Sequence, residues 1–163
     1  MPESIPSPIS FQEKRSRLLR IRRLAKKLGF EGAVEYRHVV SHAGGAQYGI
    51  GSTSDQDWLI VFADAFDRDA DPNDFSLEAI LAHERGHQLV VRHSKLAPFL
   101  SRGAALASEE ILASLIGSII VEHETDQRDL YHKALYEAVT QGMTHTHAVR
   151  LLHDLRLLLE KAL

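Results

Sequence analysis

The first regular pattern along the chain is an apolar residue at every third or fourth position, which places side chains on one face of an α-helix. The stripe consists of Leu18, Ile21, Ala25 and Leu28. It predicts a helix over residues 11–28, with Gly29 as the residue that closes it. Residues 1–10 contain three Pro and three Ser and are predicted to be a flexible tail.

The next part of the chain alternates roughly between apolar and polar positions and is rich in β-branched and aromatic residues, the pattern of β-strands. Strands are predicted over residues 32–40, 47–51 and 57–66. The last of these, DWLIVFADAF, has the clearest pattern. Gly44 and Gly45 mark a turn, and residues 67–74 (DRDADPND) are predicted to be an acidic loop.

Helical patterns dominate the remainder, each preceded by a residue that can cap a helix N-terminus. The predicted helices run from Asp74 or Ser76 to about His93, from Ser108 to about Val121, from Thr125 or Asp126 to near Gly142, and from Thr144 to Lys161. Pro98 is expected to mark the break after the first of them. Helices around a small sheet predict an α+β fold, with residues 11–163 as a single domain.

Composition limits the chemistry that this domain can perform. With 44% hydrophobic and 25% charged residues, the chain is expected to be soluble and cytoplasmic, not bound to a membrane. The longest apolar stretch, Ile111 to Val121, is too short to cross a bilayer. The chain has no Cys, which excludes disulfides and thiolate metal ligands. Any transition metal must therefore bind to His, Asp or Glu, and the chain has ten His.

Positive charge is concentrated near the N-terminus, although the net charge is −3. Eight of the 19 Lys and Arg residues fall between Lys14 and Lys27. Such a segment can contact nucleic acid or an acidic partner, or it can simply be the solvated face of an amphipathic helix. The segment has no aromatic residues that could stack on bases and no recognisable nucleic-acid module, so nucleic acid is not expected as a partner.

The strongest chemical signal is the sequence HERGH at residues 83–87, an H-E-x-x-H motif. On a helix His83 and His87 lie one turn apart on the same face, from which both rings can reach one zinc ion at roughly 2.0–2.1 Å. Glu84 lies beside that face and can reach a metal-bound water without being a ligand. The alternative is a metal-free His pair that only packs inside the protein.

This motif, with Gly86 before the second His, resembles the gluzincin zinc peptidases, in particular the minigluzincins and the ImmA/IrrE-like peptidases. The resemblance covers most of residues 11–142 in its order of elements, but only HERGH is specific. It implies a zincin-like fold, one Zn²⁺, and hydrolysis of peptide bonds in which Glu84 takes a proton from a zinc-activated water. Arg85 is an uncommon residue inside the motif.

A zinc peptidase of this kind needs a third protein ligand. Glu110, which lies 23 residues after His87, is the preferred candidate because the run EEILASLIG resembles the gluzincin glutamate helix. Small residues follow it on one helical face and would allow close approach to the motif helix. They are Ala113, Ser114 and Gly117, and Ser114 stands where the family often has an Asp that supports a ligand His.

Three other residues remain as alternatives for this third position. The first is Glu122, which together with Asp126 four residues later resembles the Glu-x-x-x-Asp of HtpX-like membrane peptidases. The second is Glu109, which directly precedes Glu110. His93 would complete the metzincin pattern, but Val90 replaces the glycine of that pattern, and His93 lies too far along a continuous helix from His83 to share a metal.

Other functional roles stay open on the sequence alone. The oxyanion formed in hydrolysis needs a hydrogen-bond donor, and the candidates are Tyr131, His132, His123, His145 and His147. Residues 47–51 can form the sheet edge that pairs with an extended peptide or protein substrate. Two alternatives to an active peptidase are a zinc-binding regulator that docks a protein partner with little turnover, and a latent peptidase whose cleft is plugged by the apolar C-terminal helix 145–162.

Overall fold

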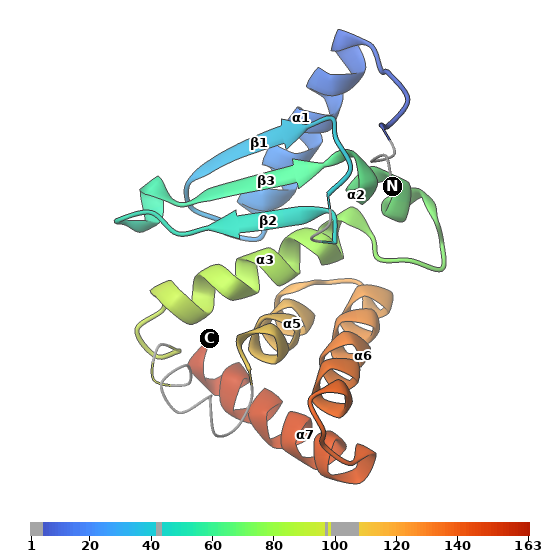
Figure 1. Cartoon of the computed structure of the whole chain (residues 1–163). Helices are drawn as coiled ribbons and strands as arrows, with labels where there is room; N and C mark the ends of the chain where they lie inside the picture. The colour runs from blue at the N-terminus through green and yellow to red at the C-terminus, as the bar shows by residue number, and fades with distance from the viewer. Residues whose placement is uncertain (1–4, 42–43, 97, 99–107) are drawn as a thin grey trace.

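The computed structural model describes residues 5–41, 44–96, 98 and 108–163. Within these ranges the chain forms an α+β fold of six α-helices and one three-stranded mixed sheet (Figure 1). The α+β class and the three strands are confirmed. None of the helices in these ranges is both long enough and apolar enough to cross a bilayer. Part of the predicted tail, residues 1–4, lies outside the described residues.

Helix α1 (Phe11–Lys27) begins and ends where the sequence predicts. The Ser10 side chain accepts a hydrogen bond from the backbone N–H of Glu13, which satisfies one of the free donors at the helix start. Gly29 adopts a positive φ of 79° after the last turn, a backbone conformation that glycine adopts without strain. The apolar stripe turns Ile21 and Ala25 into the core.

The sheet consists of β1 (Ala33–Arg37), β2 (Ala46–Gly49) and β3 (Trp58–Phe62), in the order β1-β3-β2. Strand β3 is central because it pairs in parallel with β1 and antiparallel with β2. A short 3₁₀ turn, Ser54–Gln56, precedes it. Strand β2 is therefore an edge strand, and the sheet places it next to the motif helix (Figure 1).

The predicted strand over residues 57–66 is too long, and the predicted acidic loop over 67–74 is too long as well. The strand ends at Phe62, and residues Ala63–Ala70 form helix α2. The sequence FADAF continues the alternation of the strand, but alanine is the strongest helix former. Ala63 and Ala65 also become buried in the helical conformation. Here helix propensity and packing override a local strand pattern.

Helices α3 (Leu77–Arg92), α5 (Glu109–Ile120) and α7 (His145–Ala162) start behind the predicted caps. The caps are Ser76, Ser108 and Thr144, each of which accepts a hydrogen bond from a backbone N–H three residues later. Helix α6 (Glu124–Thr140) starts earlier than predicted, after His123. Neither Thr125 nor Asp126 caps it, because Asp126 instead accepts a hydrogen bond from the Ser76 hydroxyl at 2.7 Å.

Helix α3 lies between the sheet and the C-terminal helices, which form the other layer (Figure 1). Its first turns pack into an apolar cluster with α1 and the sheet through residues such as Leu77 and Leu81. Its last turns pack into a second cluster with α5, α6 and α7 through Leu89 and Val90. The polar motif residues lie on α3 between these two apolar clusters.

Candidate metal centre

Helix α3 holds the two motif histidines on consecutive turns of one face. The Nε2 atoms of His83 and His87 lie 3.1 Å apart, and the two rings meet edge to face at a centroid distance of 4.7 Å. His83 is buried, with 6% of its surface exposed. The i, i+4 spacing therefore directs two imidazole nitrogens at the same point, as the sequence predicts.

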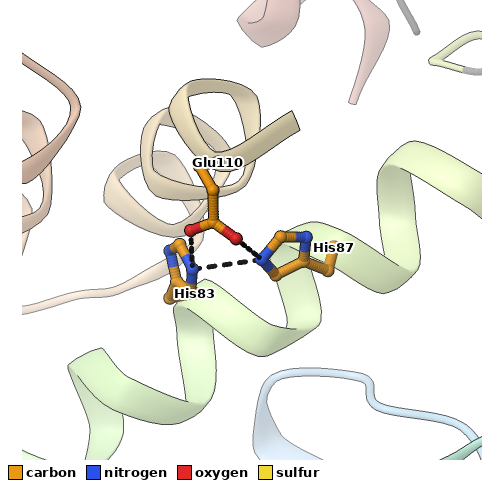
Figure 2. Close-up of side chains that lie close together, drawn as sticks. All are labelled: His83, His87 and Glu110. Carbon is orange, nitrogen blue, oxygen red and sulfur yellow. Dashed lines mark hydrogen bonds and ion pairs between the residues drawn. The ribbon is translucent and has the colours of Figure 1, made fainter. Parts of the chain in front are cut away.

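Glu110 points from the first turn of α5 at both histidines (Figure 2). One carboxylate oxygen lies 3.1 Å from His83 Nε2, and the other lies 3.0 Å from His87 Nε2. Ligand atoms of His83, His87 and Glu110 all lie within 4.8 Å of one another. The structure thus brings together the three residues chosen from the sequence, from two helices that are separate in the chain.

The alternative third ligands lie elsewhere or take a different part in the site. Glu122 is exposed and lies 3.4 Å from Lys27 of α1. His93 follows the last residue of α3, where its Nδ1 accepts a hydrogen bond from the backbone of Lys95. Glu109 is part of the site, but it contacts the outer nitrogen of His87 rather than the point where the three ligand atoms converge.

Two glycines allow α3 and α5 to approach closely enough for this convergence. A Cβ atom at Gly86 would lie 2.3 Å from the carbonyl oxygen of Ala113, and one at Gly117 would lie 3.2 Å from the backbone of Ala82. A side chain at Gly86 would therefore force the helices apart. The small-residue face predicted on α5 packs as expected, and Gly86 is its counterpart on α3.

The outer nitrogens of both histidines are held as well. His83 Nδ1 is hydrogen bonded to the Ser114 hydroxyl at 3.0 Å, and His87 Nδ1 donates to the Glu109 carboxylate at 3.0 Å. Partners at the outer nitrogen fix the orientation of a ligand ring and increase its basicity. Ser114 thus holds the ring of His83 at its outer nitrogen.

The three groups titrate far from their usual ranges. Burial lowers the pKa of His83 to about 4. Burial also opposes the charged form of His87, but hydrogen bonds to Glu110 and Glu109 outweigh it and raise the pKa to about 9. Hydrogen bonds from His83 and His87 hold the pKa of Glu110 well below its usual range. One positive charge on His87 thus faces one negative charge on Glu110 at neutral pH.

Glu84 is buried beside this cluster, with 9% of its surface exposed. Burial is the main reason why its pKa rises to about 7, and the charge of His87 and a backbone hydrogen bond from Tyr48 of β2 counteract part of that rise. A carboxyl group with this pKa exchanges a proton easily near neutral pH, which is the property of a general base or acid.

Helix α3 is fixed to its neighbours by side chains next to the motif. Arg85 donates hydrogen bonds to the carbonyl of Leu28 at the end of α1, at 3.1 Å, and to Gln88, at 2.6 Å. A cation near a helix C-terminus is favourable because the last carbonyls there lack partners. These contacts give Arg85 a structural role, because they tie α3 to the end of α1.

A buried carboxylate holds the edge strand beside α3. Asp57 accepts hydrogen bonds from the Tyr48 hydroxyl of β2 at 2.8 Å, from Gln88 at 3.0 Å, and from Arg92 at 2.6 and 3.1 Å. Although burial opposes ionisation, these hydrogen bonds hold the pKa of Asp57 well below its usual range. The network fixes the position of Tyr48, whose backbone contacts Glu84.

A cleft of about 330 Å³ opens over the cluster. Its walls come from β2, α3, α5 and α6 and from the residues around them, and they include Ala46, Tyr48, Ile50, Arg68, Phe75, His83, Glu84, His87, Glu110, Leu130 and Lys133. Strand β2 therefore forms one wall, as expected for the predicted edge strand. No residue of α7 is part of this lining in the portion of the chain that the structure describes.

None of the residues suggested as oxyanion donors lines the cleft. Tyr131 packs against the C-terminal apolar cluster, and His132 lines a neighbouring cavity. His123 precedes α6, whereas His145 and His147 lie in the exposed first turn of α7. The residue that sequence reasoning missed is Lys133, which lies three positions after Leu130 on α6 and lines the cleft with it. Helical spacing from a buried Leu130 is the signal that could have identified it.

No family model, curated relative or solved structure matches this chain. What the site can do therefore has to be argued from its geometry. Two imidazole nitrogens and a carboxylate converge on one point, and a second carboxyl group with a pKa near 7 lies beside them in a cleft. Such a set can hold a divalent cation and move a proton next to it.

Proposed function

We propose that this protein is a zinc-dependent metallopeptidase with a zincin-like fold. The observation that carries the proposal is the convergence of His83, His87 and Glu110 in the lining of the cleft, with the buried carboxyl group of Glu84 beside them. Two His and one Glu are the ligand set of many catalytic zinc sites. Ligand histidines usually have a hydrogen-bonding partner at the outer ring nitrogen, and both His83 and His87 have one.

The chemistry of the donor set fits a zinc ion. Imidazole nitrogens suit zinc better than calcium or magnesium, which prefer oxygen ligands alone. Three protein ligands leave a fourth position for water or substrate. When bound, the ion would polarise a carbonyl group and lower the pKa of a coordinated water.

Glu84 is the general base of the proposed reaction. Its carboxylate accepts a proton from the attacking water and then delivers that proton to the departing amine. Burial raises the pKa of the Glu84 carboxyl group, which favours its acceptance of a proton. The backbone N–H of Tyr48 orients the carboxyl group from the β2 side, and the Asp57 network keeps Tyr48 in place.

Strand β2 offers a way to hold a peptide substrate in an extended conformation. It lies at the edge of the sheet and borders the cleft through Ala46, Gln47 and Tyr48. In the described part of the chain, no further strand pairs with its outer side. An edge strand can bind a peptide through backbone hydrogen bonds, which favours peptides and unfolded protein segments as substrates.

The first test is metal content. Wild-type protein, stripped with chelator and reloaded with Zn²⁺, should hold about one ion per chain, and His83→Ala and Glu110→Ala should lose it. Glu122→Ala is the matched control, because this exposed glutamate contacts only Lys27 and should keep the ion. A wild-type protein that holds no zinc after reloading contradicts the proposal.

The second test separates a peptidase from a zinc-binding docking protein. Zinc-loaded wild-type protein and Glu84→Gln are incubated with a mixture of unfolded proteins, and new peptide termini are identified by mass spectrometry. The proposal expects cleavage that Glu84→Gln abolishes although it retains its zinc. If both proteins retain zinc and neither cleaves, or if both cleave equally, Glu84 is not the base of a peptidase.

A further inference from the structure

Lys133 is the one cation lining the cleft that lacks an ion-pair partner among the residues that the structure describes. Its Nζ lies 5.7 Å from the centre of the Phe75 ring. Asp129, one turn earlier on α6, borders the adjoining cavity with Lys133 but makes no ion pair with it within 4 Å. The residue as a whole is partly buried, and its charge has no carboxylate partner among the described residues.

Arg68 provides the contrast. It also lines the cleft, and its guanidinium lies 5.9 Å from the centre of the same Phe75 ring. Arg68, however, is already engaged, because it donates a hydrogen bond to the carbonyl of Gly44 at 2.9 Å and lies 3.5 Å from Asp74. Of these two cations near Phe75, Lys133 is therefore the one whose charge is not already paired with a carboxylate among the described residues.

Lys133 lines the same cleft as the cluster of ligand atoms. Leu130 and Lys133 lie one turn apart on α6 and face the same cleft as His83 and Glu84. Lys133 therefore borders the same space as the candidate ligands and the candidate base.

We propose that Lys133 stabilises the oxyanion that forms during hydrolysis, an inference that rests on the proposed function. As the water oxygen bonds to the carbonyl carbon, the π electron pair moves onto the carbonyl oxygen. Lys133 donates a hydrogen bond to that oxygen and keeps its own proton. The electron pair returns when the C–N bond breaks and Glu84 gives the water-derived proton to the amine. A charged donor in a partly dehydrated cleft suits this task.

The test uses inorganic phosphate as a tetrahedral anion and protein reconstituted with one Co²⁺, whose visible spectrum changes when a ligand binds. Phosphate is titrated against wild type, Lys133→Met, Lys133→Arg and Arg68→Met, after the cobalt affinity of each has been measured. Lys133→Met should weaken phosphate binding roughly tenfold to a hundredfold at unchanged cobalt affinity, because a hydrogen bond to a charged group is lost. Lys133→Arg should restore most of it, and Arg68→Met should change it less than threefold.

The possible results distinguish a failure of the proposed function from a failure of the role of Lys133 alone. If no cobalt or zinc binds, the proposed function has failed and the role of Lys133 fails with it. If metal binds, any of three results overturns only the role of Lys133. These are wild type that does not bind phosphate, Lys133→Met that binds phosphate as well as wild type, and Arg68→Met that weakens phosphate binding as much as Lys133→Met does. On a peptide that the wild type cleaves, Lys133→Met should lower kcat. A change in KM alone would assign Lys133 to a substrate carboxylate instead and overturn the oxyanion role.

Discussion

The Nε2 atoms of His83 and His87 lie 3.1 Å apart, and both face the carboxylate of Glu110. Their outer nitrogens are occupied by Ser114 and Glu109. Two imidazole nitrogens this close need a cation or a proton between them and the carboxylate. Hydrogen bonds to Glu110 and Glu109 raise the pKa of His87, so a proton is expected to take this place in the absence of metal. Metal and protons therefore compete for one position.

Zinc binding at pH 7.5 is expected to release about one proton per ion. His87 has a pKa of about 9 in the folded protein, so it carries a proton that the ion must displace. Apparent zinc affinity should consequently rise roughly tenfold per pH unit as the pH increases toward 9. Calorimetric titration in buffers of different ionisation enthalpy measures the number of protons directly.

Glu109→Gln is the control for this proton linkage. The glutamine oxygen can still accept the hydrogen bond from His87 Nδ1, but the negative charge that favours the protonated ring is gone. The variant should release less than a full proton at pH 8, where its His87 is partly neutral. Zinc binding by wild type that shows the same enthalpy in every buffer at pH 7.5 would contradict the linkage.

Ser114→Ala is expected to weaken zinc binding about tenfold to a hundredfold. The change leaves the buried outer nitrogen of His83 without its partner at 3.0 Å, which removes the contact that orients the ring. Ser118→Ala is a matched control, because Ser118 is equally buried on the same helix but bonds only to the carbonyl of Leu115. Competition with a chromogenic chelator compares the two, and equal zinc affinities would rule out an orienting role for Ser114.

Gly86→Ala should separate α3 from α5. The added Cβ would lie 2.3 Å from the Ala113 carbonyl oxygen, a contact that only a shift of backbone can relieve, and such overpacking costs about 1–3 kcal/mol. The gain in helix propensity, about 1 kcal/mol, is smaller. Since Glu110 moves with α5, zinc affinity should fall together with the free energy of unfolding.

Gly117→Ala tests the same interface at a less crowded point. Its nearest contacts, at 3.2 and 3.3 Å, require a shift of only a few tenths of an ångström. It should therefore cost less stability than Gly86→Ala and retain more zinc affinity. Urea denaturation and zinc competition rank the two variants, and a Gly86→Ala protein with unchanged stability and zinc content would disprove the packing argument.

More of the candidate site than of the surrounding fold could be predicted from the sequence. His83, Glu84 and His87 belong to one helix, so their relation follows from helical spacing alone. Glu110 could be preferred to Glu122 because the run EEILASLIG resembles the gluzincin glutamate helix, and because small residues follow it, such as Gly117, which allow two helices to approach. Only the second of these reasons uses steric properties that the sequence states directly.

Features that depend on how distant elements dock could not be read in the same way. Lys133 lines the cleft because α6 packs against α3 and α5. The sequence instead left five other residues open as oxyanion donors, among them Tyr131 and His132. The start of α2 at Ala63 was missed because the alternating pattern of β3 continues into it. In both cases tertiary packing decided between local interpretations that were equally reasonable.

Glu84→Gln should stabilise the metal-free protein at high pH. The pKa of Glu84 is about 7 when folded, against 4.5 for the ordinary group, so the folded state binds the proton more tightly. This contribution to stability is fully present below pH 4.5 and is lost as the pH rises through 7. Glutamine does not titrate, and the variant should therefore gain about 1–3 kcal/mol relative to wild type between pH 5 and pH 8.

Urea denaturation with chelator at pH 5, 6, 7 and 8 measures this difference. Glu160→Gln on α7 serves as the control, because Glu160 is exposed and pairs only with Arg156. The stability of this control should follow that of wild type at every pH. A constant difference between Glu84→Gln and wild type across the series would mean that burial does not raise the pKa of Glu84.

Removal of residues 145–163 should unfold the protein rather than activate it. Helix α7 contributes buried Leu152 and Leu159 to the cluster with α5 and α6, whereas none of its residues belongs to the described lining of the cleft. A plug that restrains a latent enzyme would have to occupy that cleft. Circular dichroism and gel filtration of the truncated protein should show loss of structure and aggregation.

Point variants test the same helix without removing it. Leu152→Ala creates a cavity in the core and should cost about 2–5 kcal/mol, whereas Leu158→Ala, which is half-exposed, should change stability by about 0.5 kcal/mol or less. Neither variant should increase peptide cleavage at a temperature where both are folded. Cleavage that rises in Leu152→Ala, in proportion to the loosening of α7, would instead support latency, because only a restraining helix releases activity when its packing is weakened.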